Sequence, residues 1–221
     1  MGPERENRWN SAQVKENAFW HREGVFESQM ERVISRYGPV INKLSEKIQA
    51  NSNILDVGCG PTCTAQLFSR GLKIFLDPLM DSYRKVYSEL LPEGYKISCT
   101  AENISLKNEC ADVVVCVNAL DHMIDPDKAL YEMGRVLKKE GMFVLGIFLH
   151  PPLIAIARRF IERFLPIFRE DAHPYSYTLK GIRDILKYYF SIQEEVLVYR
   201  KDSALVPSIH REDWIFICRK G

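Results

Sequence analysis

After residue 52 the chain alternates between short apolar runs and longer amphipathic segments. The apolar runs contain β-branched or aromatic residues and end at a turn or a charge, which is typical of buried strands. They fall at 53–57, 73–77, 95–99, 111–117 and 141–148. Helical periodicity occupies the segments between them, at 62–70, 79–90 and 127–138. Strands that alternate with helices form βαβ units, so this pattern predicts a mostly parallel sheet.

The C-terminal part departs from this alternation. A predicted helix near 178–189 is followed by two apolar runs, 192–199 and 213–219, with a polar loop and no helix between them. Consecutive strands joined in this way pair antiparallel. The predicted fold class is therefore α/β, with a seven-stranded, mostly parallel sheet that ends in an antiparallel C-terminal hairpin.

Helical spacing also marks residues 11–49, where Gly38-Pro39 is expected to break the helix. We expect residues 1–50 to form an N-terminal helical cap and residues 51–221 to form the α/β domain. Four aromatic residues cluster in the cap, and they fit either a packing staple of the core or a cover over a binding site. They are Trp9, Phe19, Trp20 and Phe26.

Residues 54–60, Ile-Leu-Asp-Val-Gly-Cys-Gly, are the most informative stretch of the chain. They read as a buried strand that runs into a tight turn, where Gly58 and Gly60 would let a flat ligand approach the backbone closely. The carboxylate of Asp56 would repel a pyrophosphate and suits a cationic ligand with an amino group and a sulfonium. A dinucleotide fingerprint would also carry a third glycine, where this chain has Cys63.

Polar residues follow three other predicted strands at their carboxyl ends. Asp77 comes 21 residues after Asp56, a spacing at which an acid can accept both hydroxyls of a ribose. The segments 99–103 and 118–122 follow the next two strands. Ligands bind at the carboxyl ends of parallel strands, so these four ends are expected to form one site.

Together these segments resemble the class I S-adenosylmethionine-dependent methyltransferases, in the type 11 branch that includes quinone-pathway and other small-molecule enzymes. The resemblance covers about residues 50–150 strongly, and it implies a Rossmann-like three-layer sandwich with a reversed last strand. Thr100 stands where the branch often has an aspartate at the adenine. The cofactor-binding residues that the resemblance implies are Asp56, Gly58, Cys59, Gly60, Asp77, Pro78, Thr100, Ala101, Glu102 and Asn118.

Three histidines are candidates for work on an acceptor molecule. His122 follows the fourth strand, where its imidazole could act as the general base for a substrate hydroxyl or could merely pack the loop. His150 and His173 could line the acceptor pocket or lie exposed in loops. Of the three, His122 is the catalytic candidate.

Residues 152–168 are unusually apolar and include three arginines. An amphipathic helix packed on the sheet explains this composition. Two alternatives are a lid over a greasy acceptor and an interfacial helix that contacts membrane lipid peripherally.

Composition narrows the remaining choices. The net charge of +1 shows no excess of basic residues for binding nucleic acid. No apolar run is long enough to span a bilayer. Six cysteines scattered through apolar runs indicate reduced, buried thiols in a cytoplasmic protein, and no set of residues with zinc-ligand spacing is present, so no metal is expected.

We therefore expect an enzyme that moves the methyl group of S-adenosylmethionine to a small-molecule or lipid-like acceptor by direct in-line displacement. The sequence leaves open whether oxygen, nitrogen or carbon is methylated, and it leaves the oligomeric state open. Two alternatives belong to other classes: an NAD-dependent oxidoreductase, and a non-catalytic partner or sensor protein that binds the cofactor.

Overall fold

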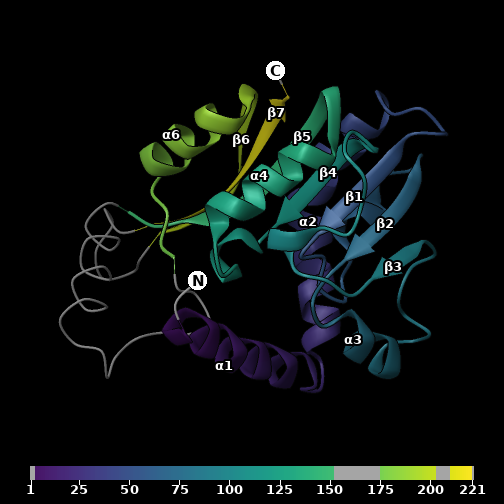
Figure 1. Ribbon diagram of the computed structural model, residues 1–221, viewed down its shortest axis with the longest axis vertical. Helices are drawn as coiled ribbons and strands as arrows, with labels where there is room; N and C mark the ends of the chain where they lie inside the picture. The colour runs from purple at the N-terminus through teal and green to yellow at the C-terminus, as the bar shows by residue number, and fades with distance from the viewer. Residues whose placement is uncertain (1–2, 152–174, 203–209, 221) are drawn as a thin grey trace.

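The computed structural model describes residues 3–151, 175–202 and 210–220. Its centre is a seven-stranded sheet in the order β3-β2-β1-β4-β5-β7-β6 (Figure 1). All neighbouring strands from β3 to β5 are parallel, and β7 is antiparallel to both β5 and β6. The strands are β1 Asn53–Val57, β2 Leu72–Leu76, β3 Tyr95–Ile97, β4 Ala111–Val117, β5 Leu137–Leu149, β6 Ser191–Asp202 and β7 His210–Arg219. The predicted parallel sheet and its antiparallel C-terminal hairpin are confirmed.

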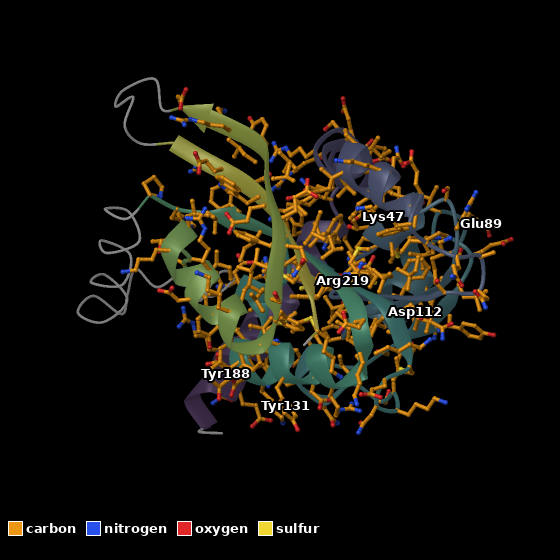
Figure 2. All side chains as sticks on the ribbon, turned by 90° about the horizontal axis from the view of Figure 1, so that it is seen from above. Lys47, Glu89, Asp112, Tyr131, Tyr188 and Arg219 are labelled. Carbon is orange, nitrogen blue, oxygen red and sulfur yellow. The ribbon has the colours of Figure 1, made fainter. Side chains whose placement is uncertain are left out.

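Helices cover both faces of this sheet (Figure 1). On one face α4 (Pro126–Val136) and α6 (Leu179–Tyr189) bury side chains such as Met133 and Leu186 in the larger core. On the other face α2 (Val25–Ser45) packs Tyr37 and Ile41 against β1, β4 and β5. The outer surfaces of α4 and α6 expose tyrosines such as Tyr188 (Figure 2). The result is the predicted three-layer sandwich.

Two further helices lie at the carboxyl ends of the parallel strands. Helix α1 spans Pro3–Trp20, and the short α3 spans Met80–Val86. Trp20 packs edge-on against Tyr83 of α3, with 6.4 Å between the ring centroids. Helix α2 belongs to a layer of the sandwich, so of the two N-terminal helices only α1 extends from it. The division of the chain at residue 50 stays a prediction.

Helix α2 corrects the prediction that Gly38-Pro39 breaks the helix. The helix runs through both residues, because Tyr37 and Ile41 on either side are fully buried against the sheet. Burial of that size outweighs the single hydrogen bond that a proline removes. The chain instead turns at residues 21–24, where Gly24 has a φ of 74°.

Two predicted helices are shorter than expected. The segment 62–70 forms only a 3₁₀ turn at Thr64–Leu67, because Cys63 takes a left-handed φ of 46° and the carboxylate of Asp56 accepts a hydrogen bond from the amide of Ala65. Helix α3 ends at Val86 instead of residue 90. Pro92 follows closely, and the residue before a proline disfavours helical geometry.

The six cysteines are free thiols. Four of them are buried as expected, whereas Cys99 and Cys110 are only partly buried. Within the described segments there is no group of three potential metal ligands, and none of their helices is long and apolar enough to cross a membrane. Residues 152–168 and His173 lie outside the described residues, so the alternatives for that segment stay predictions.

Candidate functional site

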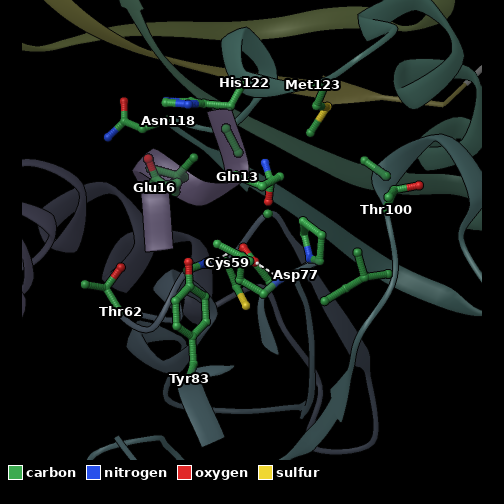
Figure 3. Close-up of a pocket in the computed structure, with 18 of the residues that line it drawn as sticks. Gln13, Glu16, Cys59, Thr62, Asp77, Tyr83, Thr100, Asn118, His122 and Met123 are labelled. Atoms are coloured by element: carbon green, nitrogen blue, oxygen red, sulfur yellow. Dashed lines mark hydrogen bonds between the residues drawn. The ribbon is translucent and has the colours of Figure 1, made fainter. Parts of the chain in front are cut away.

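A cleft opens at the carboxyl ends of β1, β2, β3 and β4 and is covered by α1 (Figure 3). It encloses about 870 Å³ of space between atoms, a volume that includes solvent at its open mouth. All the predicted cofactor residues except Asp56 line it, together with His122. Four strand ends that are far apart in the sequence therefore meet at one cavity.

The glycine turn after β1 forms part of the cleft floor. Gly58 and Gly60 have φ values of 67° and 53°, in the left-handed region that favours glycine. The amides of Gly58 and Cys59 donate to the carbonyl of Leu76 at 2.8 and 3.2 Å, which ties the turn to the end of β2. A Cβ on Gly58 would lie only 2.5 Å from the Cβ of Ala119, so this position has room for glycine alone.

Asp77 lies at the end of β2, where both carboxylate oxygens accept hydrogen bonds. Oδ2 accepts from the amide of Gly60 at 2.9 Å, and Oδ1 accepts from the amide of Leu79 at 2.8 Å. Burial raises the pKa of this carboxyl to about 6, although the two amide hydrogen bonds oppose the shift. Each oxygen keeps a second lone pair. The side chain can therefore hold the turn and still accept hydroxyl donors from a ligand.

Asp56 lies behind the floor and does not line the cleft. Its Oδ2 accepts from the amide of Ala65 at 2.7 Å, and its Oδ1 has no hydrogen-bond partner among the described residues. Burial raises the pKa of this carboxyl to about 7. The cofactor-binding role expected for Asp56 stays a prediction, and from behind the floor it would act through the bond to Ala65.

Glu102 joins the carboxyl end of β3 to the loop that follows η3 (Leu120–His122). Its Oε1 accepts from the amides of Ile124 and Asp125 at 2.7 and 3.1 Å. The segment 100–102 lines the cleft beside it. Thus Glu102, 4 % exposed, braces the loop as well as facing the cavity.

Asn118 follows β4 with a φ of 51°, and it is held from below. Its amide donates to the carbonyl of Gly146 at 2.8 Å, and its side-chain Oδ1 accepts from the hydroxyl of Tyr37 at 3.0 Å. Tyr37 is fully buried in α2. The second layer of the sandwich therefore positions a side chain in the cleft.

His122 and His150 lie in different places. His122 lines the cleft, with its Nε2 3.9 Å from Oδ2 of Asp121. His150 is not among the residues that line this cleft in the described part of the chain, and it borders a separate pocket. Its ring packs edge-on against Phe148 at 4.9 Å. His150 is therefore partly buried outside this cleft, and a role for it toward an acceptor stays a prediction.

Helix α1 supplies the wall opposite the floor. Trp9, Gln13, Glu16 and Trp20 line the cleft, and their spacing of four, three and four residues places them on one face of the helix. The aromatic pair was among the candidates for a cover over the site. Sequence reasoning missed Gln13 and Glu16, which the same helical spacing could have indicated.

The charged side chains that line the cleft are acidic. The lining includes the carboxylates of Glu16, Asp77 and Glu102, while no lysine or arginine is among its residues in the described part of the chain. Such a lining disfavours a pyrophosphate and suits a ligand with a positive centre.

Comparison with known proteins identifies the segment that carries the site. The family model of a methyltransferase domain matches residues 55–145. An uncharacterised methyltransferase of Mycobacterium tuberculosis is 34 % identical over 94 residues, which are 42 % of this chain and 38 % of that protein. The ubiquinone biosynthesis O-methyltransferase of Salmonella paratyphi A is 24 % identical over 132 residues, which are 56 % of this chain and 52 % of that protein. These matches span about half or less of the relatives' length.

The fold extends beyond the matched segment. The crystal structure of the YcgJ protein from Bacillus subtilis superposes with a TM-score of 0.64 at 18 % identity, covering 83 % of this chain and 98 % of that one. The matched segment contains the glycine turn, Asp77 and the loop after β4. Residues 55–145 of this chain therefore match a methyltransferase domain, and the fold around them is that of the YcgJ protein.

Proposed function

We propose that the protein binds S-adenosylmethionine in the cleft and transfers its methyl group to a small-molecule or lipid-like acceptor. The observation that carries this proposal is the meeting of the glycine turn, Asp77, segment 100–102 and Asn118 around one cavity whose lining is acidic. The cationic cofactor fits that charge. The finer claim, displacement in line with the methyl–sulfur bond, rests on the chemistry of the family.

Each part of the floor has a proposed task toward the cofactor. The backbone at Gly58–Gly60 holds the amino-acid end, Asp77 accepts the ribose hydroxyls, and segment 100–102 borders the adenine. When bound, the cofactor supplies a methyl group that its sulfonium has already activated. The protein therefore has mainly to align the acceptor and exclude water, which α1 does by covering the cleft.

His122 is the candidate base where the acceptor is a hydroxyl. It lies at the cleft beside Asn118, within the part of the lining formed by β4 and the loop after it. An imidazole there can take the proton that a hydroxyl loses as it gains a methyl group. A small-molecule acceptor agrees with the ubiquinone enzyme among the relatives.

The first test is calorimetric titration with S-adenosylhomocysteine, with NAD titrated in parallel. We expect micromolar binding of S-adenosylhomocysteine, and we expect Asp77→Asn to weaken it by about 10- to 100-fold, because hydrogen bonds to a charged group are lost. The matched control is Asp81→Asn, since Asp81 is 67 % exposed on α3 and is absent from the cleft lining.

The outcomes distinguish the candidate functions. Tight binding of NAD alone would favour an oxidoreductase. Binding of S-adenosylhomocysteine without methyl transfer to any small molecule would favour a partner or sensor protein. Equal loss in both aspartate variants would show that the effect is not local to the cleft, and Asp77 would then lose its proposed task.

A further inference from the structure

We propose that the cleft face of α1 is a cation-binding wall, in which Glu16 and Trp20 recognise the positive charge of the cofactor's sulfonium. This inference rests on the proposed function and adds residues from outside the segment that matches the family. It concerns the wall of the cleft, whereas the cofactor contacts proposed above all lie on the floor.

Trp20 lies directly over the glycine turn. Its ring atom Cζ2 is 3.5 Å from the point where a Cβ on Gly60 would lie. The indole Nε1 donates to Oε1 of Glu16 at 2.7 Å. That hydrogen bond fixes the orientation of the ring and places a carboxylate at its edge, and the tryptophan itself is only 8 % exposed.

Glu16 also acts across the cleft. Besides burial, its carboxylate is a cause that raises the pKa of Asp77, so the two acids are close enough to repel each other. A cation placed between them would relieve that repulsion. A tryptophan face attracts cations as well, with the largest effect where water is excluded.

The position of this pair matches the place of the sulfur atom. In S-adenosylmethionine the sulfur joins the ribose to the amino-acid chain. A cofactor with its ribose at Asp77 and its amino-acid end at Gly58–Gly60 therefore has its sulfur between these two points. Trp20 lies over Gly60 at one end of that interval, and Glu16 is hydrogen-bonded to its indole. Figure 3 shows Glu16 at the cleft with Asp77.

Gln13 provides an independent observation on the same wall. Its side-chain Oε1 is buried and has no hydrogen-bond partner among the described residues. A buried acceptor without a partner is costly, and a positively polarised ligand group would satisfy it. The wall thus combines a carboxylate, an aromatic ring and an unsatisfied oxygen acceptor, all of which favour a cation.

The test compares two ligands that differ by the charged centre. S-adenosylmethionine carries the sulfonium, and S-adenosylhomocysteine has a neutral thioether with the same amino-acid and nucleoside parts. Calorimetry gives both dissociation constants for the wild type, for Glu16→Gln, which can still accept from the indole, and for Trp20→Phe. The matched control is Glu6→Gln, which makes the same charge change at an exposed position of α1 outside the cleft.

We expect Glu16→Gln to weaken binding of S-adenosylmethionine about 10-fold and binding of S-adenosylhomocysteine less than about 3-fold. Trp20→Phe should shift the ratio in the same direction by a smaller factor, and Glu6→Gln should leave it unchanged. An equal loss for both ligands, or no loss for either, would overturn the cation wall while leaving the proposed function standing. Failure of the wild type to bind either ligand would overturn both.

Discussion

The floor and the wall of the cleft are held in different ways. The floor consists of strand ends and turns whose backbone amides donate to buried carboxylates, as Gly60 does to Asp77. The wall is a single helix, and its contacts with α3 involve side chains at its C-terminal end, where the hydroxyl of Tyr87 donates to the carbonyl of Trp20. Backbone ties to a packed sheet leave little freedom, whereas a helix that lies outside the sheet and is held by side-chain contacts opens at a lower free energy. The floor therefore sets the place of a ligand, and the wall can adjust to it.

Gly58→Ala should produce the largest effect of any substitution, because it adds a side chain to the floor at a position where none fits. The added Cβ would lie 2.5 Å from the Cβ of Ala119, at a φ of 67°. We expect a loss of about 3 kcal/mol in the free energy of unfolding and no measurable cofactor binding. Chemical denaturation and calorimetry check these values.

Gly60→Ala is the matched comparison, because Gly60 lies in the same turn but faces Trp20 of the wall. Its Cβ would make an ordinary contact of 3.5 Å with Trp20, so only the left-handed backbone is penalised, by about 1 kcal/mol. Equal losses in the two variants would contradict the view that the turn is rigidly seated against the loop after β4.

The buried carboxyls of Asp56, behind the floor, and Asp77, in the floor, should make the free energy of unfolding depend on pH. The pKa values of Asp56 and Asp77 in the folded protein, about 7 and about 6, lie above the ordinary value of 3.8. The folded protein therefore holds these protons more tightly than the unfolded chain. Their contribution to the free energy of unfolding is largest near pH 4 and declines as the pH rises through about 6 to 7.

Asp56→Asn isolates this contribution, because the amide does not titrate and its oxygen can still accept from Ala65. For Asp56 the decline in the wild type amounts to about 4 kcal/mol. Urea denaturation from about pH 4 to pH 8 should give a flatter curve for the variant than for the wild type. Parallel curves would show that Asp56 has an ordinary pKa and is hydrated in the folded protein.

The same contrast explains what the sequence could reveal. The floor was predictable because its signals are local: a glycine turn after an apolar run, and Asp77 at a fixed spacing. The wall depends on which face of α1 turns toward the cleft, and distant packing against Tyr83 and Tyr87 decides that. The spacing of Trp9 and Trp20 could have indicated that Gln13 and Glu16 share their face of the helix, but it could not show that this face turns toward the cleft.

Long-range contacts also account for the errors in the fold. The pattern at 62–70 is helical by itself, but Asp56, nine residues before Ala65, captures that amide and leaves a single 3₁₀ turn. Pro39 is a local signal for the helix to end, yet burial of α2 against the sheet outweighs that signal. In both cases a contact that no short window contains decides the local structure.

The smallest expected effect comes from loosening the wall alone. Tyr87→Phe removes the hydrogen bond to Trp20, and Ser82→Ala removes the bond of 2.7 Å from the Ser82 hydroxyl to Oδ1 of Asn17. Each should lower the free energy of unfolding by only about 1 kcal/mol. Hydrogen exchange should become several-fold faster in α1 while the amides of β4 keep their protection relative to global unfolding, and cofactor affinity should fall only a few-fold. Tyr131→Phe, at an exposed tyrosine of α4, is the control that should change neither quantity. If exchange rose equally in α1 and β4, the wall would be part of the same cooperative unit as the floor, and its freedom to adjust to a ligand would be refuted.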